Sequence, residues 1–167
     1  LEDLRMAVYD EFRRGHAPRV ASLAEQLSVS PAAASAGLST LAARRHLAVG
    51  VDGEITMAHP FTAVPLGFSV MGRDTLWWGG CAWDSFALVH LLPEQGPMVV
   101  ATTCPACHAA HAWSVDNQNP PPGDQVAHFL VPAAHMWDDV VHTCGNQRIF
   151  CTQECLSAWL DQSGEQR

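Results

Sequence analysis

The sequence predicts an α+β protein, with an N-terminal winged-helix-like helical part followed by a mostly antiparallel sheet with flanking helices. Two observations lead to this fold class. Apolar residues recur at helical spacing through residues 1–48, and from residue 67 onward short apolar runs alternate with turns rich in Gly, Pro and Asn. We therefore expect two parts, a winged-helix-like part over residues 1–58 and an α+β part over residues 59–167.

The N-terminal part contains three helical patterns and one hairpin. Residues 4–15 and 20–30 each carry apolar residues three or four positions apart, which gives each segment one apolar face. A third helix begins at Ser30 and Pro31, because serine is a good N-cap and proline suits the first helical position. The Asp-Gly pair at 52–53 then predicts a hairpin turn. Elements in this order are typical of a winged helix.

The second part mixes strands and helices. The stretch AHPFTAVPLGFSVMG joins the two parts, and His59, Pro60 and Pro65 break any helix there. We expect strands at 67–72, 97–104, 108–116 and 126–133, a loop at 117–125, and helices at 81–92 and 151–164. Residues 136–144 have no clear pattern.

Composition excludes several classes of function. The chain of 167 residues is 48% hydrophobic and 16% charged, as is typical of a folded globular protein. Its net charge is −8 and it has no lysine, whereas binding to a phosphate backbone needs clustered Lys and Arg. Nucleic acid is therefore not an expected partner, although a winged-helix regulator remains an alternative. No apolar run approaches the roughly 20 residues of a membrane span, and no signal peptide is visible. We expect a cytoplasmic protein with no membrane partner.

Six cysteines carry most of the chemical information in the sequence. An even count would allow three disulfides, but such spacing in a cytosolic chain more often indicates metal-binding or catalytic thiols. We therefore expect thiols. The cysteines are Cys81, Cys104, Cys107, Cys144, Cys151 and Cys155.

The segment CAWD places a thiol and a carboxylate at the start of a predicted helix. A helix N-terminus offers unpaired amide donors, which stabilise a thiolate at Cys81. Asp84 follows three residues later on the same face, where it could take a proton from the thiol and return it. The alternative is a structural cysteine with Asp84 as a helix cap. Four nearby aromatic residues could keep the site dry or simply belong to the core: Trp77, Trp78, Trp83 and Phe86.

Two cysteine pairs have the spacing of a zinc site. Cys104 and Cys107 form a CxxC pair, and Cys151 and Cys155 form a CxxxC pair at the start of the last predicted helix. Four thiolates form a closed structural zinc site, so we expect a structural zinc here, with unpaired buried cysteines as the alternative. His108 and His111 are spare candidate ligands.

Cys144 is left over and could form a two-thiolate site with Cys81. Two thiolates and one carboxylate suit a soft metal better than a structural zinc.

On these residues the chain resembles the alkylmercury lyases, and we identify it as a divergent member of that family. The resemblance rests on the helical N-terminal part and on the segments AHPF, CAWD, TTCPAC and VVHTC. Cys81, Asp84 and Cys144 match the family's Cys-x-x-Asp motif and its second cysteine. Cys107 departs from the pattern, since the family more often reads CPATG there, and the pair at 151 and 155 is also unexpected.

The resemblance implies cleavage of a carbon–mercury bond by protonolysis. The two thiolates would bind the mercury of an organomercurial, and Asp84 would deliver a proton to carbon, which releases hydrocarbon and Hg(II). No cofactor would be required for catalysis. Expected partners are a small organometallic substrate and, as acceptors of Hg(II), cellular thiols or a mercury reductase. The alternative function is a non-enzymatic protein that binds or senses soft metals and contains a structural zinc.

Overall fold

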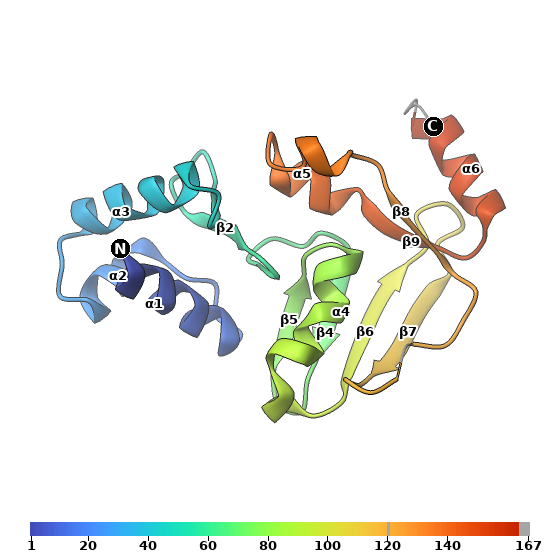
Figure 1. Ribbon diagram of the computed structural model, residues 1–167, viewed down its shortest axis with the longest axis horizontal. Coiled ribbons are helices and arrows are strands. Elements are labelled where there is room, and N and C mark those ends of the chain that lie inside the picture. The colour runs from blue at the N-terminus through green and yellow to red at the C-terminus, as the bar shows by residue number, and fades with distance from the viewer. Residues whose placement is uncertain (120, 164–167) are drawn as a thin grey trace.

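The computed structural model describes residues 1–119 and 121–163, and it has helices arranged around a seven-stranded antiparallel sheet (Figure 1). The predicted α+β class is confirmed. Pro120, within the predicted loop, and the predicted helix end at Gly164 lie outside the described residues.

Three helices and a hairpin form the N-terminal region, in the predicted order. Ser30 caps the third helix, because its side chain accepts a hydrogen bond from the amide of Ala33 at 3.1 Å. The turn of the hairpin closes between Gly50 and Glu54. The winged-helix assignment itself stays a prediction. The elements are α1 (Glu2–Arg13), α2 (Val20–Gln26), α3 (Pro31–Ala43), β1 (Ala48–Val49) and β2 (Ile55–Ala58).

The large sheet continues from this hairpin without a break. Its strand order is β1-β2-β3-β5-β4-β6-β7, and every pair is antiparallel. The strands β3 and β5 were not predicted. The five strands beyond the hairpin are β3 (Phe61–Thr62), β4 (Phe68–Met71), β5 (Leu76–Gly79), β6 (Met98–Thr103) and β7 (Ala110–Val115).

The remaining elements are one helix over this sheet and two C-terminal helices that contact a separate two-stranded sheet. The helix α4 (Ala82–Leu91) lies over β4, β5 and β6 and also contacts β9 of a two-stranded sheet (Figure 1). The unassigned segment 136–144 contains the start of a short helix, which Asp139 caps by accepting a hydrogen bond from the amide of His142 at 2.9 Å. These last elements are β8 (Val126–Phe129), α5 (Val140–Gly145), β9 (Gln147–Phe150) and α6 (Gln153–Ser163).

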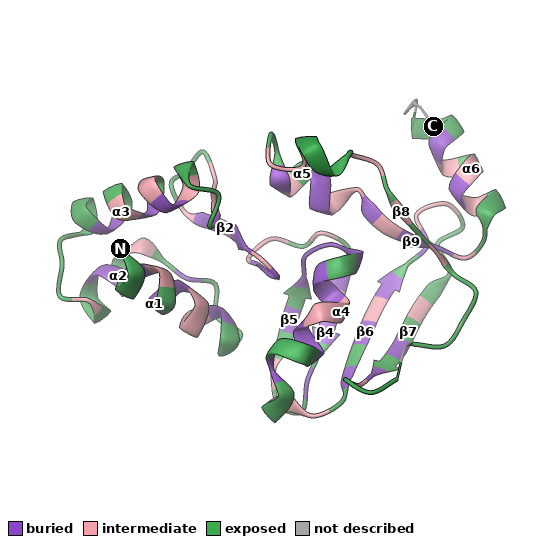
Figure 2. Ribbon diagram, in the orientation of Figure 1, coloured by how far each residue is buried: buried purple, intermediate pink, exposed green. Residues whose placement is uncertain are grey.

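Within residues 1–119 and 121–163, the buried residues form one large core and two small ones. The large core joins the N-terminal helices to the sheet and to the inner face of α4 (Figure 2). One small cluster contains Cys81 and Cys144, and the other contains Cys104 and Phe150 with the apolar face of α6. The cysteines are thus divided between two separate places in the fold. Among the described residues, no helix has the length and apolarity needed to cross a bilayer.

Candidate functional site

The first site residue, Cys81, lies where β5 ends and α4 begins. It is the N-cap of α4, and its Sγ accepts a hydrogen bond from the amide of Asp84 at 3.4 Å. The side chain is 3% exposed. The sulfur thus lies within reach of a free amide at the helix N-terminus, the position that the sequence predicted for it.

The contact between Cys81 and Asp84 is reciprocal, so the two residues form a capping box. Oδ2 of Asp84 accepts a hydrogen bond from the amide of Cys81 at 3.2 Å, so the carboxylate folds back over the first turn of the helix. A side chain at Gly80 would collide with this oxygen, so the absence of a Cβ there leaves room for it. Asp84 is therefore both the helix cap and an acidic group beside a thiol, two roles that the sequence had presented as alternatives.

Cys144 comes from α5 and is fully buried beside the same carboxylate. Its Sγ donates a hydrogen bond to Oδ2 of Asp84 at 3.7 Å. Hydrogen bonding to the Cys81 thiol raises the pKa of Cys144, and burial and the negative charges of Cys81 and Asp84 raise it further. Cys144 is thus a protonated thiol at neutral pH. The structure brings together Cys81, Asp84 and Cys144, the three residues predicted for this site.

His59 is a fourth member of the site that the sequence analysis missed. It follows β2, and its Nδ1 lies 3.0 Å from Oδ2 and 3.2 Å from Oδ1 of Asp84. The phenol of Tyr9 donates a hydrogen bond to the His59 carbonyl, and the rings of His59 and Trp137 form a T-shaped pair. Nε2 of His59 is buried and has no hydrogen-bond partner among the described residues. The sequence showed this histidine only as a helix breaker, although it stands in the AHPF segment.

A cavity of about 380 Å³ opens beside these groups. A second, apolar pocket of about 570 Å³ adjoins it, and Trp83 and Phe129 line both. The four aromatic residues considered from the sequence have different places. Trp83 lines the cavity and Phe86 lines the second pocket, whereas Trp77 donates a hydrogen bond to the Phe12 carbonyl and Trp78 is exposed. The residues lining the first cavity include His59, Cys81, Asp84, Cys144 and Gln147.

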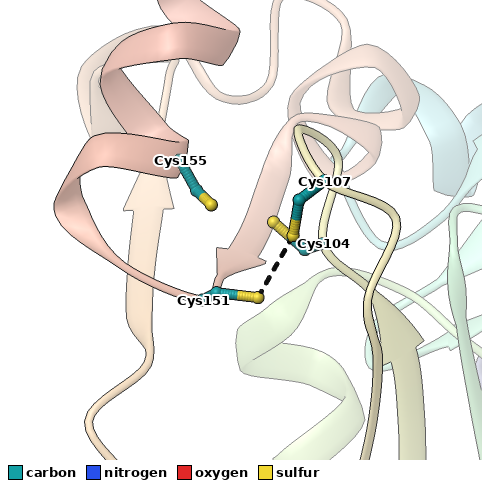
Figure 3. A group of neighbouring side chains, drawn as sticks. All are labelled: Cys104, Cys107, Cys151 and Cys155. Atoms are coloured by element: carbon teal, nitrogen blue, oxygen red, sulfur yellow. Dashed lines mark hydrogen bonds between the residues drawn. The ribbon is translucent and has the colours of Figure 1, made fainter.

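The other four cysteines gather at a second place, around the turn between β6 and β7 (Figure 3). Their sulfurs all lie within 4.8 Å of one another, and Sγ of Cys107 is 3.4 Å from Sγ of Cys151. Burial raises the pKa of Cys104, but backbone amides that donate to its sulfur outweigh this effect and lower the pKa to about 6. Of the two spare histidines, His111 contacts the sulfur of Cys151 through Nε2 at 3.3 Å, and His108 is not in the cluster.

Comparison with known proteins adds independent information. The family model described as alkylmercury lyase (MerB) matches residues 61–167. A solved structure, described as the mercury-bound form of MerB2, superposes with a TM-score of 0.68 at 16% sequence identity, over 99% of this chain and 82% of that chain. This likeness establishes a shared fold. A search of curated proteins gave no significant match.

The matched segment covers well over half of the chain and includes Cys81, Asp84 and Cys144. The expectation drawn from the CAWD and VVHTC segments is thereby confirmed at the level of the family. The chain belongs to the alkylmercury lyase family and is a carbon–mercury lyase.

Proposed function

We propose that Cys81 and Cys144 bind the mercury of an organomercurial and that Asp84 transfers a proton to its carbon. The observation that supports this mechanism best is the single carboxylate oxygen, Oδ2 of Asp84, that contacts both the Cys81 amide and the Cys144 thiol. A proton acceptor in contact with a protonated thiol has a direct route for proton transfer. A protein that only sequesters a soft metal would need the thiols but not the acid.

The proton balance follows from the two thiols. Cys81 binds R–Hg⁺ as a thiolate, and its proton leaves to solvent or with the displaced ligand. As Cys144 binds the mercury, its thiol proton moves to Asp84. Asp84 then delivers this proton to carbon as the carbon–mercury bond breaks, which gives R–H and a mercury bis-thiolate. The two sulfurs raise electron density on mercury and so weaken its bond to carbon.

In this mechanism, His59 orients the carboxylate of Asp84. When Nδ1 of His59 carries the proton, it donates a hydrogen bond to the Asp84 carboxylate. That hydrogen bond holds Oδ2 toward Cys144. His59 itself need not exchange a proton with the substrate.

The two adjoining cavities fit an organic group and its metal. The thiols and Asp84 line the smaller cavity, and the apolar pocket beyond Trp83 and Phe129 offers space for the hydrocarbon substituent. An apolar wall excludes water, which would compete for the proton. The Hg(II) product would pass to cellular thiols or to a reductase. All six cysteines carry free thiols, which supports a reducing compartment such as the cytoplasm.

The test is release of benzene from phenylmercuric acetate in the presence of excess thiol. Wild-type protein should release benzene well above the protein-free rate, and Cys81→Ser and Cys144→Ser should lose this activity. Circular dichroism would confirm that both variants are folded. Mercury binding by the wild type without release of benzene would contradict the proposal and favour sequestration.

A further inference from the structure

The four-cysteine cluster lies away from the residues of the proposed reaction and joins two parts of the fold. Cys104 and Cys107 stand in the turn between β6 and β7 of the large sheet. Cys151 follows β9 of the small sheet, and Cys155 is in the first turn of α6 (Figure 3). Residues about 45 positions apart in the chain thus present sulfur atoms to one shared point.

The spacing of the sulfurs suits a tetrahedral metal ion. Zinc–thiolate bonds of about 2.3 Å place the sulfurs of a four-thiolate site about 3.8 Å apart. The observed separations are 3.4 Å for Cys107 and Cys151 and below 4.8 Å for every pair. A disulfide would need sulfurs about 2 Å apart. The four sulfurs therefore surround a space of the size that a zinc ion fills.

The backbone around Cys104 is already arranged for a ligand sulfur. Amides of Ala106, Cys107 and Cys151 donate hydrogen bonds to its Sγ. His108 adopts a positive φ of 60°, which closes the turn, and its amide donates to the Cys104 carbonyl at 3.0 Å. The turn thus holds Cys104 and Cys107 together, with their sulfurs close to that of Cys151 (Figure 3).

A neighbouring arginine and a histidine that contacts one of the sulfurs also support a bound divalent cation. Four thiolates and one Zn²⁺ carry a net charge of −2, and the half-buried guanidinium of Arg148 lies close enough to Cys104 for their charges to interact. Nε2 of His111 contacts the Cys151 sulfur from outside the four. Such hydrogen bonds to ligand atoms are usual around structural metals.

We propose that Cys104, Cys107, Cys151 and Cys155 bind one structural zinc ion that fastens the C-terminal α6 and β9 to the β6–β7 turn. The site is closed by four thiolates, so it holds structure and has no open position for substrate. The zinc also fixes the far end of β9, whose near end follows α5 and Cys144. It thereby steadies the segment that carries the second mercury-binding thiol.

Metal analysis of the full chain, purified under reducing conditions without chelator, tests the proposal. Wild-type protein should contain about one zinc per chain, and after exchange with Co²⁺ it should show the strong visible absorption of tetrahedral cobalt thiolate. Cys107→Ser should lose most of the metal, and its exposed side chain makes this variant the least disruptive to packing. The matched control, Cys144→Ser, removes a cysteine outside the cluster and should keep the zinc.

Three results would overturn the proposal. They are a zinc content near zero in wild-type protein refolded with excess zinc, full zinc content in Cys107→Ser, and loss of zinc in folded Cys144→Ser. The cobalt spectrum of the wild type decides the question if Cys107→Ser does not fold. Because none of these readouts depends on benzene release, a failure here is distinct from failure of the proposed reaction.

Discussion

At the scale of single residues, Asp84 combines a structural and a chemical role. The same carboxylate caps α4 by accepting from the Cys81 amide and lies against the Cys144 thiol. A cap fixes the carboxylate relative to α4, and so it also fixes the distance from this acid to the Cys81 sulfur at the start of the same helix. Sequence spacing could place Cys81 and Asp84 on one helix face, but it could not show that one oxygen serves both contacts.

The contact between His59 and Asp84 leads to a prediction about His59. Replacing it in His59→Phe keeps a ring of similar size but removes the Nδ1 hydrogen bond to the carboxylate. The rate of benzene release should fall roughly 10–100-fold, the usual cost of losing a hydrogen bond that orients a reacting group. In His59→Asn, the side-chain amide can replace Nδ1 as donor.

The two variants separate positioning from packing. Steady-state kinetics should show that His59→Asn recovers most of the kcat lost in His59→Phe, with little difference in KM. Equal losses of kcat in two variants that melt at the wild-type temperature would show that the hydrogen bond is not needed.

At the scale of elements, the turn between β5 and α4 decides where the carboxylate lies. A Cβ added at Gly80 would collide with Oδ2 of Asp84. We therefore expect Gly80→Ala to displace the carboxylate and to slow benzene release by about 10-fold or more, since a misplaced proton donor loses much of its effect. Both thiols should still bind mercury.

Gly145→Ala is a suitable control for this variant. It adds the same methyl group at the end of α5, where the nearest atom lies 3.8 Å away on Leu66. Its rate should match that of the wild type. Measurement of benzene release and of mercury binding on both variants checks the prediction, and normal release from Gly80→Ala would refute it.

Most elements could be predicted from the sequence, and the strands β5 and β9 were missed because the polarity of their residues does not follow their burial. In β5, Leu76 and Trp78 are exposed, so apolar side chains on both faces hide the alternation of a half-buried strand. In β9, Gln147 is buried and Arg148 half-buried, so a strand that lies against the core reads as polar. Helices such as α1 and α6 were predictable because one apolar stripe recurs over several turns.

At the scale of the whole molecule, the proposed site is assembled from three distant segments. His59 lies after β2, Cys81 and Asp84 lie at the start of α4, and Cys144 lies in α5. Pairing of β3 with β5 brings the turn that carries His59 to the start of α4. Motif spacing predicted the two cysteines and the aspartate, but His59 depends on this strand pairing and could not be read from the sequence.

The central claim is that Asp84 carries the proton that cleaves the carbon–mercury bond, and Asp84→Asn tests it most directly. Asparagine keeps the shape of the side chain but cannot transfer the proton. The matched control is Asp74→Asn, which changes an exposed aspartate in the turn between β4 and β5.

The deciding measurement is benzene release and mercury binding by the two variants on the same phenylmercuric acetate. We expect Asp84→Asn to bind phenylmercury through its two thiols and to release benzene about 10²–10⁴-fold more slowly than the wild type, while Asp74→Asn is unaffected. Benzene release by folded Asp84→Asn at the wild-type rate would contradict the account.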